Sequence, residues 1–332
     1  MLRDAAAYTI EQEIGSKADT KQLSVQGYGL HSGSLNTLAV IRSTSKKSWL
    51  EFVAKVEKAL FRAPAEWTRL SGTTRSTALV LRGNTKLRFE LRTIEHFMAA
   101  AFVYDLQGFQ VSVESDHMEH GILEVPILDG SSKEWHCLRS FESRTIPEKR
   151  AVWIAVKDFL LEDGSKKVRI EKMQSNHHSH YHCKVDFGPS WKQEKSFSID
   201  WLNPMASRET FDKEIAPART FGFKHELEEL VRRGLIKGAS LENALLLDDN
   251  KVVNTSGFRV PQELAAHKLL DGIGDFALLG KPLIGSVHLD QAGHYLHLRA
   301  LDEAVRQGAI RPAFLNSAGE LFVDDSANEF KS

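Results

Sequence analysis

Alternation of apolar and polar positions predicts strands through most of the first half of the chain. Residues 25–42 (VQGYGLHSGSLNTLAVIR) alternate on both sides of a glycine-bearing turn, as a β-hairpin does. Residues 87–93 (LRFELRT) and 109–115 (FQVSVES) are further predicted strands. Residues 124–132 (EVPILDGSS) are predicted as a strand that closes on an Asp-Gly turn. The first half is therefore expected to be rich in β-structure.

One segment interrupts this β pattern. Residues 93–106 (TIEHFMAAAFVYDL) favour a helix through their Ala, Phe and Met content, with Thr93 as the N-cap. A polar, proline-bearing stretch, SRTIPEKR at 143–150, then separates the two halves of the chain. We expect a domain boundary there, between an N-terminal domain of residues 1–146 and a C-terminal domain of residues 147–332.

The second half begins again with strands and continues with helices. Alternating or continuous apolar runs predict strands at 151–159, 166–172 and 180–187. Apolar residues at helical spacing predict helices at 225–238, 261–280 and 296–309. The overall pattern is that of an α+β protein.

Composition narrows the class of protein. A hydrophobic content of 42% and a charged content of 26% are those of a soluble globular chain. Lys plus Arg (43) nearly balance Asp plus Glu (44), so the basic surplus of a nucleic-acid-binding protein is missing. No stretch approaches the roughly 20 apolar residues of a transmembrane segment. Cys137 and Cys183 are too few for a disulfide framework, and we expect a cytoplasmic protein.

The first candidate chemistry lies in two of the predicted helices. His267 and Asp271 are four positions apart, and so lie on one helix face where both can bind one cation. In the other helix, His96 could supply a third ligand and Glu95 could take a proton from the attacking water. Two His, one Asp and an open position are a standard catalytic zinc set. On these residues alone, a surface His–Asp pair and a half-buried His remain the alternatives.

Three more polar residues accompany this set. His294 follows a glycine in a predicted loop or turn, where an imidazole could donate a proton. Asp275 lies one turn beyond Asp271 and could orient that imidazole. Lys268 could counter negative charge on a substrate or transition state. Taken singly, each of these residues is also compatible with a solvated surface position.

Two histidine-containing segments also resemble metal sites. His178, His180 and His182 fall on one face of a predicted strand, within the cluster at 177–182, and DHMEH at 116–120 mixes His with carboxylates. Spacing alone gives neither segment a fixed ligand geometry. A polar strand face and a solvated loop are the interpretations we prefer for them.

A series of motifs resembles one family. In order along the chain these motifs are TIEHFMAA, EVPILDGSS, ARTFGF, GLIKGASLENALLLDD, HKLLDGIGD and AGH. In these motifs and their order, the chain resembles the UDP-3-O-acyl-N-acetylglucosamine deacetylases. The resemblance extends from about residue 20 to about residue 305. Near the N-terminus, GYGLHSG resembles the glycine-rich hairpin with which these proteins begin. The resemblance implies zinc-dependent removal of the N-acetyl group from UDP-3-O-(3-hydroxyacyl)-N-acetylglucosamine in lipid A biosynthesis, with Fe²⁺ as the alternative metal.

The resemblance also implies the fold and the site. The fold is two α+β domains, each a small sheet with a helix layer, with the helices sandwiched between the two sheets. The implied zinc ligands are His96, His267 and Asp271. The implied catalytic residues are Glu95 as general base, His294 as proton donor with Asp275 supporting it, Thr220 at the oxyanion and Lys268 at the substrate. The implied substrate contacts are Phe221 and Phe223 at the sugar and acyl chain, and Leu227 and Leu246 along the acyl passage.

Departures from the family pattern leave other functions open. SDHMEHGIL, in the loop around residues 115–123, is longer than usual, residues 43–91 match poorly, and Arg92 stands where a small residue is common. A diverged zinc amidohydrolase acting on another N-acetylated sugar conjugate is the first alternative. A non-enzymatic module that binds nucleotide-sugars or lipids is the second. We expect a monomer, and the sequence leaves the preferred acyl-chain length open.

Overall fold

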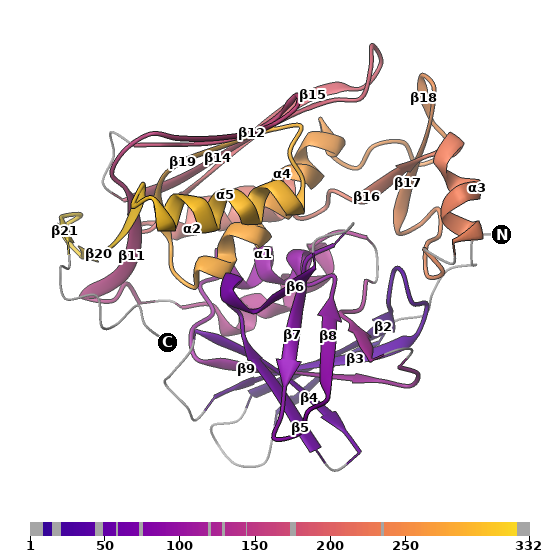
Figure 1. Ribbon diagram of the computed structural model, residues 1–332, viewed down its shortest axis with the longest axis horizontal. Coiled ribbons are helices and arrows are strands. Elements are labelled where there is room, and N and C mark those ends of the chain that lie inside the picture. The colour runs from indigo at the N-terminus through magenta and orange to yellow at the C-terminus, as the bar shows by residue number, and fades with distance from the viewer. Residues whose placement is uncertain are drawn as a thin grey trace.

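The computed structural model describes most of the chain. The described residues are 9–14, 21–43, 49–57, 59–72, 76–118, 121–127, 130–143, 145–172, 177–233 and 236–323. Their strands form two large sheets and one small one, and the main helices lie between the large sheets (Figure 1). The α+β fold with helices between two sheets is thereby confirmed.

The first large sheet comes from the N-terminal half. Its strands are β1 (Thr9–Ile14), β2 (Lys21–Tyr28), β3 (Leu35–Arg42), β4 (Leu50–Val56), β5 (Ala59–Pro64), β6 (Leu70–Gly72), β7 (Ala78–Arg82), β8 (Arg88–Arg92), β9 (Phe109–Ser115) and β10 (Ile122–Glu124). They run in the order β1-β2-β3-β9-β4-β5-β7-β8-β10, with β6 on β7. The predicted hairpin is confirmed, because β2 and β3 pair antiparallel. Its alternation places Leu23, Val25, Leu38 and Val40 in the core.

The second large sheet comes from the C-terminal half. Its strands are β11 (Lys149–Ala155), β12 (Phe159–Asp163), β13 (Lys166–Glu171), β14 (His178–Asp186), β15 (Lys192–Asp200), β19 (Leu283–Asp290), β20 (Ile310–Asn316) and β21 (Leu321–Val323). The order is β12-β13-β19-β11-β20-β21, and β14 joins β15 to β19. The boundary predicted at residue 146 falls just before β11, and as a division into domains it stays a prediction.

Three helices fill the space between the sheets: α1 (Glu95–Val103), α4 (Glu263–Phe276) and α5 (His294–Arg306). Every residue of α1 is buried, and the apolar positions of α4 at Leu264, Leu269, Leu270 and Ile273 have no exposed surface. The helices predicted at 93–106 and 261–280 are therefore confirmed as core elements. The helix predicted at 296–309 starts two residues earlier, at His294.

Shorter elements complete the fold. They are α2 (Pro204–Thr210) with a π-helical turn at Phe211–Ile215, α3 (Lys224–Arg232), and 3-10 helices at Trp67–Arg69, Lys133–Phe141 and Ala277–Leu279. A small sheet of β16 (Thr220–Phe223), β17 (Ala244–Asp248) and β18 (Lys251–Val252) lies beside α3 at one end of the molecule (Figure 1). No helix in the described ranges is long and apolar enough to cross a membrane.

Three local predictions were wrong. Ile94 rather than Thr93 is the N-cap of α1, because the Thr93 hydroxyl donates instead to Glu124 Oε1 at 2.9 Å. The strand predicted at 124–132 ends at Glu124, since Pro126 lacks the N–H that a β-ladder needs; Asp129 of the predicted turn lies outside the described residues. His294 is the first residue of α5 and not part of a loop.

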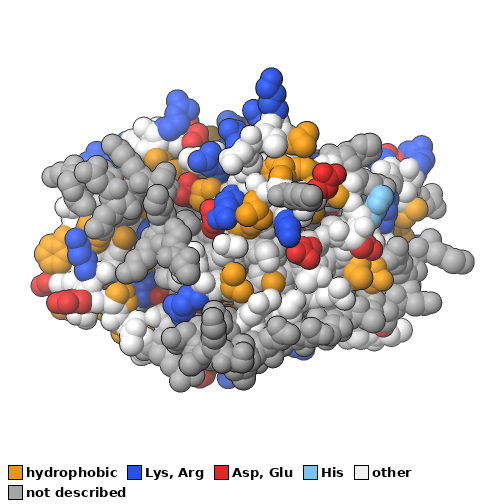
Figure 2. Space-filling view, turned by 90° about the horizontal axis from the view of Figure 1, so that it is seen from below, with side chains coloured by type: hydrophobic (Ala, Val, Ile, Leu, Met, Phe, Trp, Pro, Cys, Tyr) orange, Lys and Arg blue, Asp and Glu red, His pale blue; other side chains and the backbone are white. Residues whose placement is uncertain are grey.

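The surface beneath the first sheet carries charges of both signs. Lys and Arg side chains lie there between Asp and Glu side chains and apolar groups (Figure 2). This mixture agrees with a formal net charge of −1 for the whole chain.

Candidate active site

Helices α1 and α4 approach each other closely because Gly274 has no side chain. A Cβ built at this position would lie 2.1 Å from the backbone carbonyl oxygen of Glu95, well inside van der Waals contact. The first turn of α1 can therefore lie directly against α4. This contact joins residues that are far apart in the sequence.

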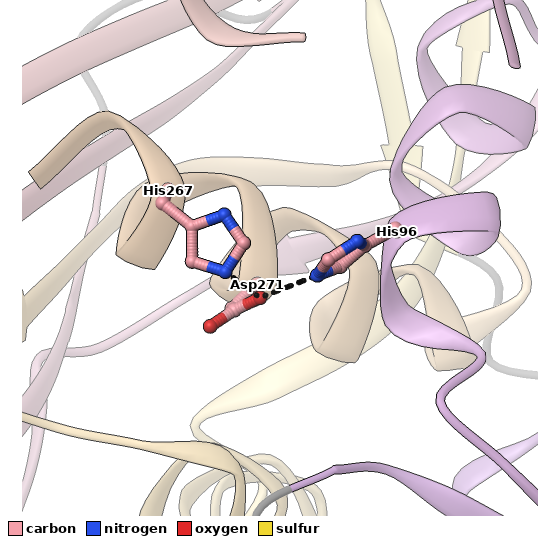
Figure 3. A group of neighbouring side chains, drawn as sticks. All are labelled: His96, His267 and Asp271. Carbon is pink, nitrogen blue, oxygen red and sulfur yellow. Dashed lines mark ion pairs between the residues drawn. The ribbon is translucent and has the colours of Figure 1, made fainter. Parts of the chain in front are cut away.

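The contact brings the three predicted metal ligands together. The Nε2 atoms of His96 and His267 each lie 3.5 Å from Asp271 Oδ1. The two imidazole rings meet edge to face, with centroids 4.9 Å apart. Figure 3 shows His267 and Asp271 extending from one helix toward His96 on the other. One donor atom from each residue lies within 4.8 Å of the others, and all three residues are buried.

The hydrogen-bond pattern around these residues suits a metal ion. His267 Nδ1 lies 3.0 Å from the Ala218 carbonyl oxygen, so Nδ1 carries the hydrogen and Nε2 offers a lone pair. Burial lowers the pKa of His267 to about 3, which keeps the ring neutral. Asp271 Oδ1 is buried without a hydrogen-bond partner among the described residues. Such an orphaned carboxylate oxygen, facing two imidazole nitrogens, fits a cation.

Lys268 keeps this carboxylate ionised. Its Nζ lies 2.8 Å from Asp271 Oδ2. Burial alone would raise the pKa of Asp271, but the charge of Lys268 holds it well below its ordinary value. Lys268 also lies over the ring of Phe221, with Nζ 5.6 Å from the centroid.

Glu95 and His294 face each other beside the metal ligands. Glu95 Oε1 lies 3.8 Å from His294 Nε2, and Asp271 Oδ2 lies 3.9 Å from the same nitrogen. Glu95 is fixed through its other oxygen, which accepts a hydrogen bond of 3.0 Å from the Thr77 backbone N–H. Both side chains are buried, Glu95 on α1 and His294 at the start of α5.

Asp275 orients His294 from the far side. Its Oδ2 lies 2.8 Å from Nδ1 of His294 and 2.8 Å from Nδ1 of His297. Burial would raise the pKa of Asp275, but the charge of His294 and hydrogen bonds from both imidazoles lower it to about 2. An ionised carboxylate only accepts, so both imidazoles donate through Nδ1. The Nε2 atom of His294 is thereby turned toward Glu95.

The pKa values of Glu95 and His294 are both raised above their ordinary values. Burial raises the pKa of Glu95, although the charge of His294 opposes this. Burial would lower the pKa of His294, but Asp275 and Glu95 raise it to about 9. Near neutral pH, His294 is therefore cationic and can donate a proton through Nε2.

Sequence reasoning missed two residues of this site. The hydroxyl of Thr77 donates to Asp275 Oδ1 at 2.5 Å and lies 3.2 Å from His294 Nδ1. His297 shares Asp275 with His294 and has no exposed surface. Helical spacing could have found His297, three positions after His294. No sequence signal pointed to Thr77, which reaches the site through the first sheet.

A cavity of about 210 Å³ opens beside these groups. Thr220, Lys268 and His294 line its polar part. Its apolar wall includes all four predicted substrate contacts, which are Phe221, Phe223, Leu227 and Leu246. The cavity thus lies beside the predicted metal ligands, with Glu95 and Asp275 next to His294 outside its lining.

A buried ion pair holds β16 at the cavity. Arg219 Nε and the Arg219 backbone N–H both donate to Glu263 Oε1 at 2.9 Å. Glu263 also accepts the Arg259 backbone N–H at 2.6 Å. Both partners of the pair are almost fully buried. This pair joins the strand that carries Thr220 to the start of α4.

Glu124 holds the glycine-rich turn at 29–34 against the same cavity. Its carboxylate accepts the backbone N–H of His31 at 3.0 Å, and both the N–H and the hydroxyl of Ser32, at 2.9 Å and 2.7 Å. The Thr93 hydroxyl adds a fourth donor. The turn that places His31 in the cavity wall is thus fixed by one buried carboxylate.

Of the other histidine-containing segments, 116–120 shows no cation site in its described part. Asp116 accepts the Leu35 backbone N–H at 2.9 Å, while Glu119 and His120 lie outside the described residues. The cluster at 177–182 is considered below.

Comparison with known proteins identifies the family of the chain. The profile of the family LpxC: UDP-3-O-acyl N-acetylglycosamine deacetylase matches residues 18–306. Proteins named UDP-3-O-acyl-N-acetylglucosamine deacetylase are similar over most of their lengths. The one from Syntrophotalea carbinolica is 31% identical over 85% of each chain. That from Anaeromyxobacter dehalogenans is 32% identical over 83% of each chain. That from Teredinibacter turnerae is 33% identical over 86% of this chain and 88% of the relative. The chain therefore belongs to the UDP-3-O-acyl N-acetylglycosamine deacetylase family and is an amidohydrolase of lipid A biosynthesis.

Proposed function

We propose that this chain hydrolyses the N-acetyl group of UDP-3-O-(3-hydroxyacyl)-N-acetylglucosamine at a zinc ion held by His96, His267 and Asp271. The family is zinc-dependent. The observation that carries the proposal is the orphaned Asp271 Oδ1, 3.5 Å from two imidazole nitrogens and adjacent to the Glu95–His294 pair. Bound zinc supplies Lewis acidity, which lowers the pKa of water to about 7 and polarises the acetyl carbonyl.

Glu95 is the general base of this proposal. One of its oxygens is fixed by the Thr77 backbone N–H, so the other is free to accept a proton from the attacking water. Its raised pKa brings the carboxyl closer to the operating pH, where a general base works best.

His294 is the general acid. Amide hydrolysis needs a proton on the departing glucosamine nitrogen, and His294 presents a protonated Nε2 at neutral pH. Asp275 keeps the ring in one orientation and stabilises its positive charge. His297 and Thr77 position Asp275 by donating to it.

Thr220 and Lys268 serve the developing oxyanion. The Thr220 backbone N–H already donates to the Gly130 carbonyl oxygen at 2.7 Å, so its hydroxyl is the group left for substrate. Lys268 adds a positive charge to the lining of the same cavity. The apolar wall of Phe221, Phe223, Leu227 and Leu246 suits the acyl chain.

We also propose that the enzyme acts as a cytoplasmic monomer. Both cysteines are free, and the Cys183 thiol is buried, as in proteins of reducing compartments. Gel filtration at assay concentration and fractionation of cells would test this pair of statements.

The test is acetate release from UDP-3-O-(3-hydroxyacyl)-N-acetylglucosamine by zinc-loaded protein. Glu95→Gln preserves size and should lower kcat by about 10²- to 10⁴-fold while the zinc content stays unchanged. Glu114→Gln, an exposed position on β9, is the matched control and should keep full activity.

The second part of the test measures acetate release from non-acylated UDP-N-acetylglucosamine and compares it with release from the acylated compound. A large preference for the acylated compound supports the proposed substrate. Equal or higher turnover of another N-acetylated sugar conjugate would assign the chain to the diverged alternative instead. Full activity in Glu95→Gln would remove Glu95 from the mechanism.

A further inference from the structure

We propose that a second divalent transition-metal site lies at the corner where β14 begins and β15 ends, with His177, His178 and Asp200 as its ligands. The site is separate from the catalytic centre: His178 and Asp200 lie on β14 and β15 and His177 directly precedes β14, whereas Glu95, His96, His267, Asp271 and His294 lie on α1, α4 and α5. Its three side chains are partly exposed, by 32%, 30% and 29% respectively, so an ion can reach them from solvent.

The donor atoms converge on one space. His177 Nε2 lies 3.9 Å from Asp200 Oδ1, and His178 Nε2 lies 3.8 Å from Asp200 Oδ2. The two rings are neighbours, with centroids 4.4 Å apart. One donor atom from each residue lies within 4.8 Å of the others.

These separations suit an ion better than direct hydrogen bonds. An N–H···O hydrogen bond is about 2.9 Å long, so the histidine–aspartate separations of 3.8 Å and 3.9 Å are too long for one. Zinc lies about 2.1 Å from nitrogen and oxygen ligands, so two ligand atoms of a tetrahedral ion are about 3.4 Å apart. The histidine–aspartate separations exceed this by about 0.5 Å or less, which a small rotation of the partly exposed side chains would close.

The backbone holds the ligands in place. His178 and Asp200 are direct partners in the antiparallel β14–β15 ladder. The His177 carbonyl oxygen accepts the Trp201 backbone N–H at 3.0 Å. Asp200 Oδ1 accepts the backbone N–H groups of Leu202 and Asn203 at 2.9 Å and 3.1 Å, which fixes the plane of its carboxylate. Ligands oriented in this way bind metal with less loss of side-chain freedom.

The neighbouring histidines have different partners. His180 Nδ1 lies 2.6 Å from the Ser198 hydroxyl, and His182 Nδ1 lies 2.9 Å from the Ser196 hydroxyl. These pairs also belong to the β14–β15 ladder, but serine replaces aspartate. The cluster at 177–182 therefore divides into a carboxylate-paired end and a serine-paired stretch.

The donor set selects the class of ion. Two imidazoles and one carboxylate suit Zn²⁺, Ni²⁺, Co²⁺ and Cu²⁺, whereas Mg²⁺ and Ca²⁺ prefer oxygen ligands alone. An ion here would join the start of β14 to the end of β15, next to α2. Because it binds the folded chain, it would also raise the midpoint of thermal unfolding.

The experiment counts Zn²⁺ ions on chelator-stripped full-length protein by calorimetric titration and elemental analysis, with Mg²⁺ as the negative control. We expect two ions per wild-type chain and one in His177→Ala, with affinity at this site reduced at least about tenfold. Asp200→Asn, which keeps one oxygen for the two backbone donors, should behave like His177→Ala. His180→Ala is the matched control and should keep both ions.

The outcomes separate this site from the catalytic one. His96→Ala should bind one ion, and His96→Ala combined with His177→Ala should bind none. If the wild-type chain binds one Zn²⁺ ion and His177→Ala binds none, the result supports this site and speaks against the catalytic zinc. If His177→Ala and Asp200→Asn bind as many Zn²⁺ ions as wild type, the proposal is overturned. It is also overturned if the wild-type chain binds one Zn²⁺ ion and only His96→Ala loses it. Acetate release by zinc-loaded His177→Ala should match wild type.

Discussion

At the scale of single residues, Asp275 links several polar side chains of the site. One buried carboxylate accepts hydrogen bonds from His294, His297 and Thr77. Since an ionised carboxylate cannot donate, it makes Nδ1 of both imidazole rings a hydrogen-bond donor. The chemistry proposed for His294 therefore depends on a residue that does not itself face the cavity.

This dependence predicts the pH profile. In wild type, kcat/KM should fall as the pH drops through the raised pKa of Glu95, and fall again as the pH rises through about 9, where His294 loses its proton. Asp275→Asn removes the charge that favours the imidazolium. Its alkaline limb should therefore move down toward the ordinary histidine value of 6.5. An alkaline limb that stays in place in Asp275→Asn would mean that another group titrates there.

Thr220→Ala tests the oxyanion role. Removing one preorganised donor typically lowers kcat by about 10²- to 10³-fold, or about 3–4 kcal/mol. Because the backbone N–H of Thr220 holds the strand through Gly130, the fold should survive the loss of the hydroxyl. Steady-state kinetics and circular dichroism give the two readouts. An unchanged kcat would remove Thr220 from the mechanism, and Thr220→Ser should recover most of the rate.

The sequence predicted those site residues that lie in short, ordered motifs. His267 and Asp271 share a helix face, and Glu95 and His96 are adjacent, so spacing alone grouped them in pairs. Thr77 could not be found in this way. Its place beside Asp275 depends on how the first sheet packs against α4, and no local pattern encodes that contact.

At the scale of elements, the contact of α1 with α4 depends on Gly274. In Gly274→Ala the added Cβ would meet the Glu95 carbonyl oxygen at 2.1 Å, so the two helices must move apart. Overpacking of this kind costs about 1–3 kcal/mol. Because the proposed metal ligands lie on both helices, zinc affinity should fall together with stability.

Chemical denaturation and zinc titration would measure both effects. Gly72→Ala is the control, because an added Cβ there meets none of the described atoms within 4 Å. If Gly274→Ala loses stability but keeps wild-type zinc affinity, the spacing of the helices does not control the metal site.

The helices and strands with long periodic patterns of apolar residues were predicted correctly, but the residues at which some of them begin were not. Helix α4 and the β2–β3 hairpin follow their apolar periods closely. The start of α1 was misassigned because Glu124, far away in sequence, takes the Thr93 hydroxyl. Likewise, His294 follows Gly293, which suggested a turn, yet this glycine is the N-cap of α5.

At the scale of the whole molecule, a buried ion pair connects the two halves across the predicted boundary. Arg150 on β11 donates to both oxygens of Asp105, at 2.9 Å and 2.8 Å, with 9% and 5% of the side chains exposed. Arg150→Ala leaves the buried Asp105 carboxylate without its cation and should destabilise the protein by about 3–5 kcal/mol. Arg62→Ala removes an exposed ion pair with Glu51 and should cost at most about 1 kcal/mol.

Urea unfolding, followed by fluorescence and far-UV circular dichroism, would measure both variants. Similar small losses in the two variants would show that Arg150 does not couple the halves. Two separated transitions in wild type would show that residues 1–146 and 147–332 unfold independently.

The arrangement of the proposed metal ligands has a consequence for the synthesis of the chain. His96 leaves the ribosome long before His267 and Asp271, and only the packing of α4 on α1 brings the three together. Of the proposed ligand set, the emerging N-terminal half therefore carries only His96, and the complete site forms once α4 has packed on α1. The proposal thus implies that a newly made chain takes up its zinc, and becomes active, only after the C-terminal half has been made.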